Sequence, residues 1–148
     1  MTGSALTVLL LIVLSGCDTL SPPLSKGTIT GTGTVVLDYL ESEKLWFYEG
    51  ITYYGYVELT NFPSYGVEIS APYGIYVTTI DLDTAPPDTG GIYRSGSVEL
   101  DYGRYYFARP DSLHYGKLLL LDLTYNVDSA TVTVEWYVQT ENTRRDFR

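Results

Sequence analysis

The segment 131–139, TVTVEWYVQ, alternates between apolar and polar side chains with a period of two. This period places successive side chains on opposite faces of a strand, whereas a helix would need apolar residues three or four positions apart. One face carries Val132, Val134, Trp136 and Val138, and the other carries Thr131, Thr133, Glu135, Tyr137 and Gln139. The pattern predicts an antiparallel strand with one face on a core and the other toward solvent.

Shorter alternations of the same kind follow along the chain, in YVELTN at 56–61 and GVEIS at 66–70. The segment 117–125, KLLLLDLTY, has leucines on both faces, so we expect a central strand that is covered on both sides. Turn-forming residues such as TAPPDTGG at 84–91 separate these runs. We therefore expect an all-β fold, a single antiparallel β-sandwich (jelly-roll-like or Ig-like) of about eight strands over residues 28–140.

The composition agrees with a folded β domain. The chain has 15 tyrosines, 45% hydrophobic residues and 18% charged residues, a balance that argues against disorder. One short helix is expected at 38–45, DYLESEKL. The net charge of −9 argues against a nucleic-acid partner. The basic residues of the last segment, 141–148, are expected to belong to a polar, solvated tail without a role of its own.

The N-terminal part of the chain has a different character. Residues 5–14, ALTVLLLIVL, form an apolar run that is shorter than the ~20 residues of a membrane-spanning helix, and the length is typical of a signal peptide. Leu14-Ser15-Gly16-Cys17 follows at once and resembles the lipobox of bacterial lipoproteins.

The lipobox resemblance implies that residues 1–16 are a cleaved signal peptide and that Cys17 carries a covalent lipid, palmitate included. Several acyl chains together give stable membrane anchoring. Residues 17–27 would then be the lipidated cysteine and a short tether that contains Pro22 and Pro23. The protein would lie in the cell envelope, on the periplasmic or extracellular face of a membrane. The alternative for Cys17 is a buried free cysteine.

A second resemblance lies in the C-terminal half. The stretch 98–107, VELDYGRYYF, followed by YGKL at 115–118, resembles the end of bacterial pre-peptidase C-terminal domains. Those modules are small β-sandwiches that close with an apolar strand, a glycine-containing turn and a Tyr-Tyr strand. The resemblance implies a sandwich fold and carries no activity with it.

Few residues offer catalytic or metal-binding chemistry. His114 is the only histidine, and no G-x-S-x-G motif surrounds a serine, so we expect no enzyme activity. The best candidate for a metal site is DLDTAPPD, in which Asp81, Asp83 and Asp88 could hold a structural calcium ion at a strand end. The alternative is a solvated acidic strand end, and no other cofactor is expected.

The tyrosines are the other candidate site. Tyr54, Tyr56 and Tyr137 fall on the polar side of their predicted strands, where exposed rings could stack on sugars or contact a protein. Ordinary cross-strand packing is the alternative. We therefore expect a lipid-anchored envelope protein whose noncatalytic sandwich binds or spaces envelope components, with a protein partner. The alternative function is an envelope glycan-binding module that uses the exposed tyrosines.

Overall fold

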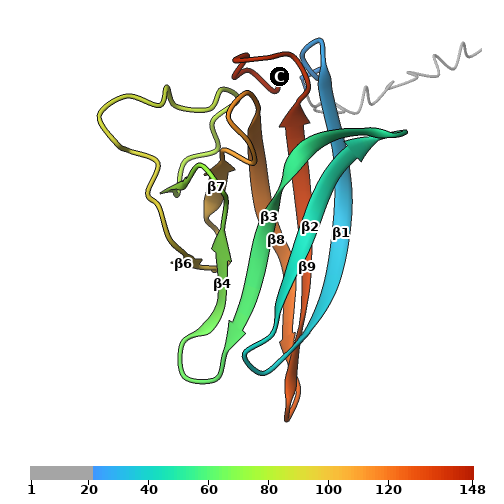
Figure 1. Ribbon diagram of the computed structural model, residues 1–148, viewed down its shortest axis with the longest axis vertical. Coiled ribbons are helices and arrows are strands. Elements are labelled where there is room, and N and C mark those ends of the chain that lie inside the picture. The colour runs from blue at the N-terminus through green and yellow to red at the C-terminus, as the bar shows by residue number, and fades with distance from the viewer. Residues whose placement is uncertain (1–21) are drawn as a thin grey trace, which may run out of the picture.

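The computed structural model describes residues 22–148 and has two antiparallel β-sheets that pack face to face (Figure 1). The five-stranded sheet has the order β1-β9-β8-β7-β5, and the four-stranded sheet has the order β2-β3-β4-β6. The nine strands are β1 (Thr28–Asp38), β2 (Ser42–Glu49), β3 (Thr52–Phe62), β4 (Gly66–Ser70), β5 (Ile75–Thr78), β6 (Val98–Glu99), β7 (Tyr105–Ala108), β8 (Tyr115–Tyr125) and β9 (Ser129–Gln139). The expected all-β sandwich is confirmed.

The main core lies between the two sheets and follows the predicted alternation. In β9 the apolar set Val132, Val134 and Val138 is fully buried, and Trp136 packs against this core. The four-stranded sheet supplies inward-facing residues at every second position, including Val57 and Leu59 of β3. Alternation sorts side chains between the core and the outer surface because the pleat turns each residue to the opposite face.

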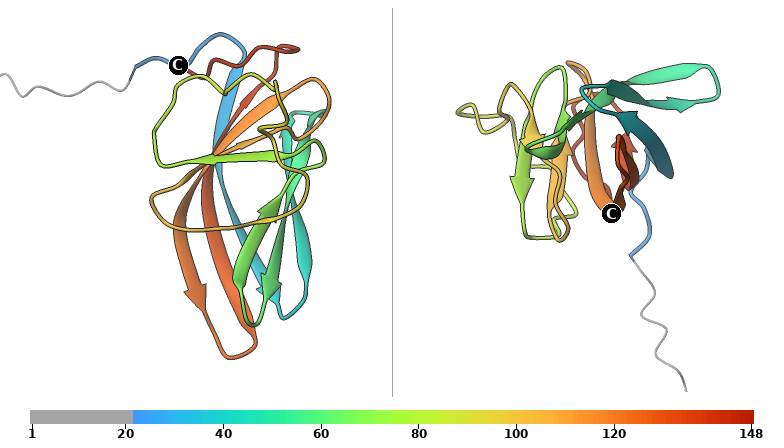
Figure 2. Two further views of the ribbon diagram at one scale, coloured as in Figure 1. Left: turned by 90° about the vertical axis from the view of Figure 1, so that its left-hand side faces the viewer. Right: turned by 90° about the horizontal axis from the view of Figure 1, so that it is seen from below.

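A second core covers the outer face of the five-stranded sheet. The long connection between β5 and β6 and the C-terminal segment fold over this face (Figure 2). The cluster consists of Ala85, Tyr93, Phe107, Tyr115, Tyr137 and Phe147. The first half of β8 is therefore buried on both sides, whereas Leu121 in its second half is 47% exposed. The prediction of a strand covered on both sides over 117–125 is thus confirmed for the first half alone.

The prediction of a solvated tail over 141–148 is wrong. Phe147 is 1% exposed, and its backbone N–H donates to the carbonyl of Asp83 at 2.7 Å. The buried Gln139 side chain donates to the carbonyl of Asp146 at 2.8 Å, and the N–H of Ser25 donates to the carbonyl of Phe147 at 3.0 Å. The domain therefore extends on both sides of 28–140, because the two ends of the described chain bind each other.

The helix expected at 38–45 is also wrong. Residues 22–148 contain no helix, so none that could cross a membrane. The chain leaves β1 at Asp38, turns through Leu40 with a φ of 61°, and enters β2 at Ser42. The N–H of Leu40 donates to the carbonyl of Asn61 on β3, so hydrogen bonds to other strands replace those of a helical turn.

The strand directions place two features at the same end of the sandwich. β1 begins at the end of the sandwich that is uppermost in Figure 1 and runs toward the opposite end. β2 runs back, so that the β2–β3 turn lies at the same end as the start of β1. The N-terminal end of the described chain and the tip of the β2–β3 hairpin therefore point in the same general direction.

Candidate binding surface on the β2–β3 hairpin

The outer face of the β2–β3 hairpin carries a group of exposed aromatic side chains. Gly50 and Ile51 alone connect the strands, and Gly50 has a φ of 61°, which a two-residue hairpin turn with glycine first requires. This tight turn places Tyr48 opposite Tyr53, and a β-bulge further along the hairpin then places Trp46 opposite Tyr56. We call Trp46, Tyr48, Tyr53 and the half-buried Tyr56 the aromatic surface.

The rings of the aromatic surface contact each other in pairs. The ring centroids of Trp46 and Tyr56 are 4.7 Å apart, and those of Trp46 and Tyr53 are 6.0 Å apart with an interplanar angle of 72°. The ring centroids of Tyr48 and Tyr53 are 6.2 Å apart. Trp46, Tyr48 and Tyr53 line a shallow hollow of about 500 Å³. Because the planes are tilted, the rings surround a concave surface and do not form a flat platform.

A cation and an apolar tip flank this surface. The ammonium nitrogen of Lys44 lies 4.4 Å from the centroid of Tyr56 and 5.7 Å from that of Trp46, which is a cation–π geometry. At the tip of the hairpin, Ile51 is 95% exposed, and Trp46 is 43% exposed although it is the largest side chain of the group. Contiguous exposed apolar surface of this kind is typical of an interaction site.

A β-bulge decides which tyrosine belongs to this surface. The register shifts between Trp46 and Tyr48, so that Phe47 opposes both Tyr54 and Gly55. Gly55 has a φ of 91°, and a side chain at this position would collide with the backbone of Pro110. The bulge turns Tyr54 away from the aromatic surface and toward the main core, where it is half-buried.

Tyr54 contacts the only histidine of the chain. Its ring lies edge-on to His114, with centroids 5.2 Å apart and an interplanar angle of 82°. His114 is buried, and its Nδ1 lies 2.7 Å from Oδ2 of Asp111. Oδ1 of Asp111 accepts the backbone N–H groups of Leu113 and His114, so this group organises the β7–β8 loop.

The third predicted tyrosine is buried on the other sheet. Tyr137 does point to the outer face of β9, as its position predicts, but it is only 9% exposed because the C-terminal segment covers it. Its hydroxyl accepts a hydrogen bond from Arg148 at 3.0 Å, and burial raises its pKa. Of the three tyrosines singled out by sequence, only Tyr56 lies on the aromatic surface.

Sequence reasoning missed Trp46, Tyr48 and Tyr53. The signal was present in KLWFYEGITYY at 44–54, where Leu45 and Phe47 alternate with Trp46 and Tyr48 before a glycine turn. The helix assigned to 38–45 hid the start of this strand. The register between β2 and β3 then decides which rings meet.

The three aspartates of the predicted calcium site have separate partners. Asp81 pairs with Lys117 of β8, and Asp88 pairs with Arg109. Asp83 contributes its backbone carbonyl to Phe147. In residues 22–148, no three acidic, histidine or cysteine side chains gather in a group that could hold a metal ion.

Cys17 and the segment before it lie outside the described residues. Comparisons with protein-family models, curated proteins and solved structures give no match to this chain.

Proposed function

We propose that this protein is a lipid-anchored envelope protein whose noncatalytic β-sandwich binds a protein partner through the aromatic surface. The exposed group formed by Trp46, Tyr48 and Tyr53 carries the proposal, because tryptophan and tyrosine dominate the binding energy of protein interfaces. The Leu14-Ser15-Gly16-Cys17 motif supports the anchor. The noncatalytic assignment rests on the sequence, in which His114 is the only histidine and no G-x-S-x-G motif surrounds a serine.

Three observations favour a protein over a glycan. The rings of Trp46 and Tyr53 stand at 72° to each other, which does not provide the parallel stacking planes that a run of sugar rings would use. Lys44 also covers a face of Tyr56. The exposed Ile51 adds an aliphatic side chain, and its burial in an apolar pocket of a protein partner would be favourable.

The tether restricts where the partner can be. From Cys17 to Pro22 the chain can span roughly 18 Å at most, since an extended chain advances about 3.6 Å per residue. The hairpin tip lies at the end of the sandwich where the described chain begins. The aromatic surface would therefore meet partners that lie close to the bilayer.

Site-specific photocrosslinking in cells tests this proposal. A photoreactive phenylalanine analogue at Tyr53, which is 67% exposed, should give one discrete adduct. The matched control is Tyr65, which is 72% exposed in the β3–β4 turn at the opposite end of the sandwich. The adduct at 53 should disappear when Trp46→Ala is added, and it should be absent from 65. Equal labelling from both positions would show that the hairpin has no special role.

The glycan alternative is tested on the same variants. Full-length protein in detergent is sedimented with protein-stripped cell wall and with envelope polysaccharide. Retention that is lost in Trp46→Ala and in Tyr53→Ala, but kept in Tyr65→Ala, would replace the protein partner by a glycan. The anchor is tested separately, since Cys17→Ser should abolish the incorporation of radiolabelled palmitate, and persistent labelling would refute it.

A further inference from the structure

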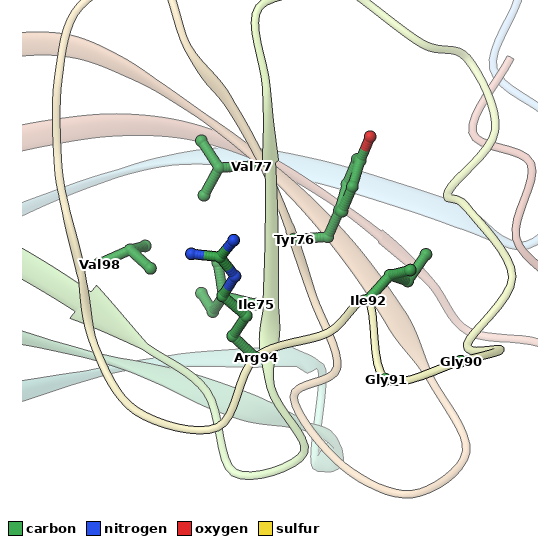
Figure 3. Close-up of a pocket in the computed structure, with 8 residues that line it drawn as sticks. All are labelled: Ile75, Tyr76, Val77, Gly90, Gly91, Ile92, Arg94 and Val98. Carbon is green, nitrogen blue, oxygen red and sulfur yellow. The ribbon is translucent and has the colours of Figure 1, made fainter.

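A pocket lies at the open edge of the five-stranded sheet, far from the aromatic surface in the strand order. β5 is the last strand of this sheet, and the loop 90–98 approaches its free side. The pocket has a volume of about 370 Å³ and is lined by Ile75, Val77, Val98, Arg94 and the backbone of Gly90 and Gly91 (Figure 3). Apolar side chains from both sheets thus meet at one open edge.

The backbone of β5 is only partly paired on this side. Ile75 exchanges two hydrogen bonds with Arg94, of 3.0 and 2.9 Å, so its N–H and C=O point away from β7. Alternation along the strand gives Val77 the same direction, since it lies two residues further on. No other backbone group of residues 22–148 pairs with the N–H or C=O of Val77 on the free side. The loop leaves the strand after one bridge, at Ile75 and Arg94.

Arg94 brings a positive charge to this edge. Figure 3 shows its side chain extending from the loop toward the side of the pocket that holds Val77 and Val98. Within residues 22–148, every other lysine and arginine side chain has an ion pair, a hydrogen bond or an aromatic ring as its partner, and Arg94 has none of these. In a chain with a net charge of −9, a cation without a partner is an unusual feature.

We propose that the β5 edge binds an extended peptide segment of a partner protein, which adds to the sheet as an antiparallel strand next to Val77. The segment would exchange backbone hydrogen bonds with Val77, place an apolar side chain between Ile75 and Val98, and present a carboxylate to Arg94. This is strand addition, in which backbone hydrogen bonds supply affinity and side-chain pockets supply specificity. The inference does not depend on the aromatic surface or on the lipid anchor.

Charge argues against a second copy of this chain as the occupant. β5 has the sequence IYVT and no carboxylate, so a second β5 edge would bring another Arg94 and no counter-charge for either guanidinium. A strand that carries a carboxylate would form an ion pair with the Arg94 guanidinium. β5 itself is short, which limits uncontrolled pairing of the edge.

The test uses full-length protein in detergent and two short synthetic peptides as probes. Both alternate valine with threonine, and they differ at one central position, which is glutamate in one and lysine in the other. We expect the glutamate peptide to bind and to slow hydrogen exchange at the Val77 amide, and the lysine peptide to bind at least about tenfold more weakly, a difference of about 1.4 kcal/mol.

Two pairs of variants separate the charge from the backbone contribution. Arg94→Glu should reverse the peptide preference, whereas Arg104→Glu, on the exposed turn before β7, should leave it unchanged. Val77→Pro removes the free N–H at an edge position that tolerates proline and should abolish binding, whereas Val77→Thr retains the amide and should bind. If Val77→Pro does not fold, the Arg94 pair remains decisive.

Three results would overturn the proposal. The first is that neither peptide protects the Val77 amide. The second is that Arg94→Glu binds the glutamate peptide as tightly as Arg104→Glu does. The third is that protein without peptide forms a dimer in which Val77 is already protected, which would assign the edge to a second copy.

Discussion

The ammonium group of Lys117 lies on the outer face of β8 and pairs with Asp81 of the loop that covers this face. The lysine side chain is 4% exposed, whereas that of Asp81 is 47% exposed. Lys117 also donates to the carbonyl of Leu82 at 2.9 Å and lies 5.3 Å from the ring centroid of Tyr105. One buried cation therefore binds the long β5–β6 connection to the sheet.

The unequal burial of this pair predicts unequal effects of its removal. Asp81→Asn leaves a buried ammonium without its counter-charge, and we expect a loss of about 1–3 kcal/mol in the free energy of unfolding. Lys117→Met removes the buried charge and keeps most of the volume, so we expect a change below about 1 kcal/mol. Urea denaturation measures both, with Asp101→Asn as the control, because its partner Arg104 is 46% exposed. A larger loss for Lys117→Met would contradict this account.

Phe147 is a core residue although it lies next to the last residue of the given sequence. Its side chain is fully buried in the second core, with its ring centroid 6.2 Å from that of Phe107. Phe147→Ala should therefore reduce the free energy of unfolding by about 3–5 kcal/mol, as for other buried phenylalanines. Removal of Arg148 alone should cost much less. An unchanged melting temperature in Phe147→Ala would instead support the prediction of a solvated tail over 141–148.

The C-terminal segment should also weaken in acid. Hydrogen bonds from Arg144 lower the pKa of Asp146 to about 2, whereas an unfolded aspartate titrates near 3.9. Because the folded pKa is the lower one, this stabilisation is complete above about pH 4 and is lost as the pH falls toward 2. Asp146→Asn should remove that part of the pH dependence. Melting curves between pH 5 and 2 measure the difference, and parallel curves for the two proteins would contradict it.

Calcium should not stabilise the domain through its aspartates. Asp81 and Asp88 already have cationic partners, Lys117 and Arg109, that a calcium ion would have to displace. We expect the melting temperature of the full-length protein to be the same in millimolar calcium, in magnesium and in a chelator. A rise with calcium alone, absent from Asp81→Asn, would establish the site predicted from the sequence.

The period-two alternation predicted the fold class because it reflects local geometry. The inward set of β9 and the buried leucines of β8, Leu118 and Leu120, follow from which side chains can leave water. The helix at 38–45 failed because a turn at Leu40 closes through Asn61, a partner on another strand that no local pattern reveals.

The binding surface was harder to predict, since exposure depends on what covers a face. Tyr56 and Tyr137 both point outward from their strands, yet only Tyr137 is covered, by a segment that includes Phe147. Tyr54 changes face through a bulge at Gly55.

The sequence was enough to predict an antiparallel sandwich, because each strand has one apolar face that must leave water, and a chain without amphipathic helices can cover these faces with a second sheet. The tertiary structure alone decided which tyrosines remain exposed, which cation pairs with Asp81 and which edge of the sheet stays open. These outcomes depend on contacts between segments far apart in the chain, where register, bulges and covering loops select among the side chains that local geometry has only turned outward.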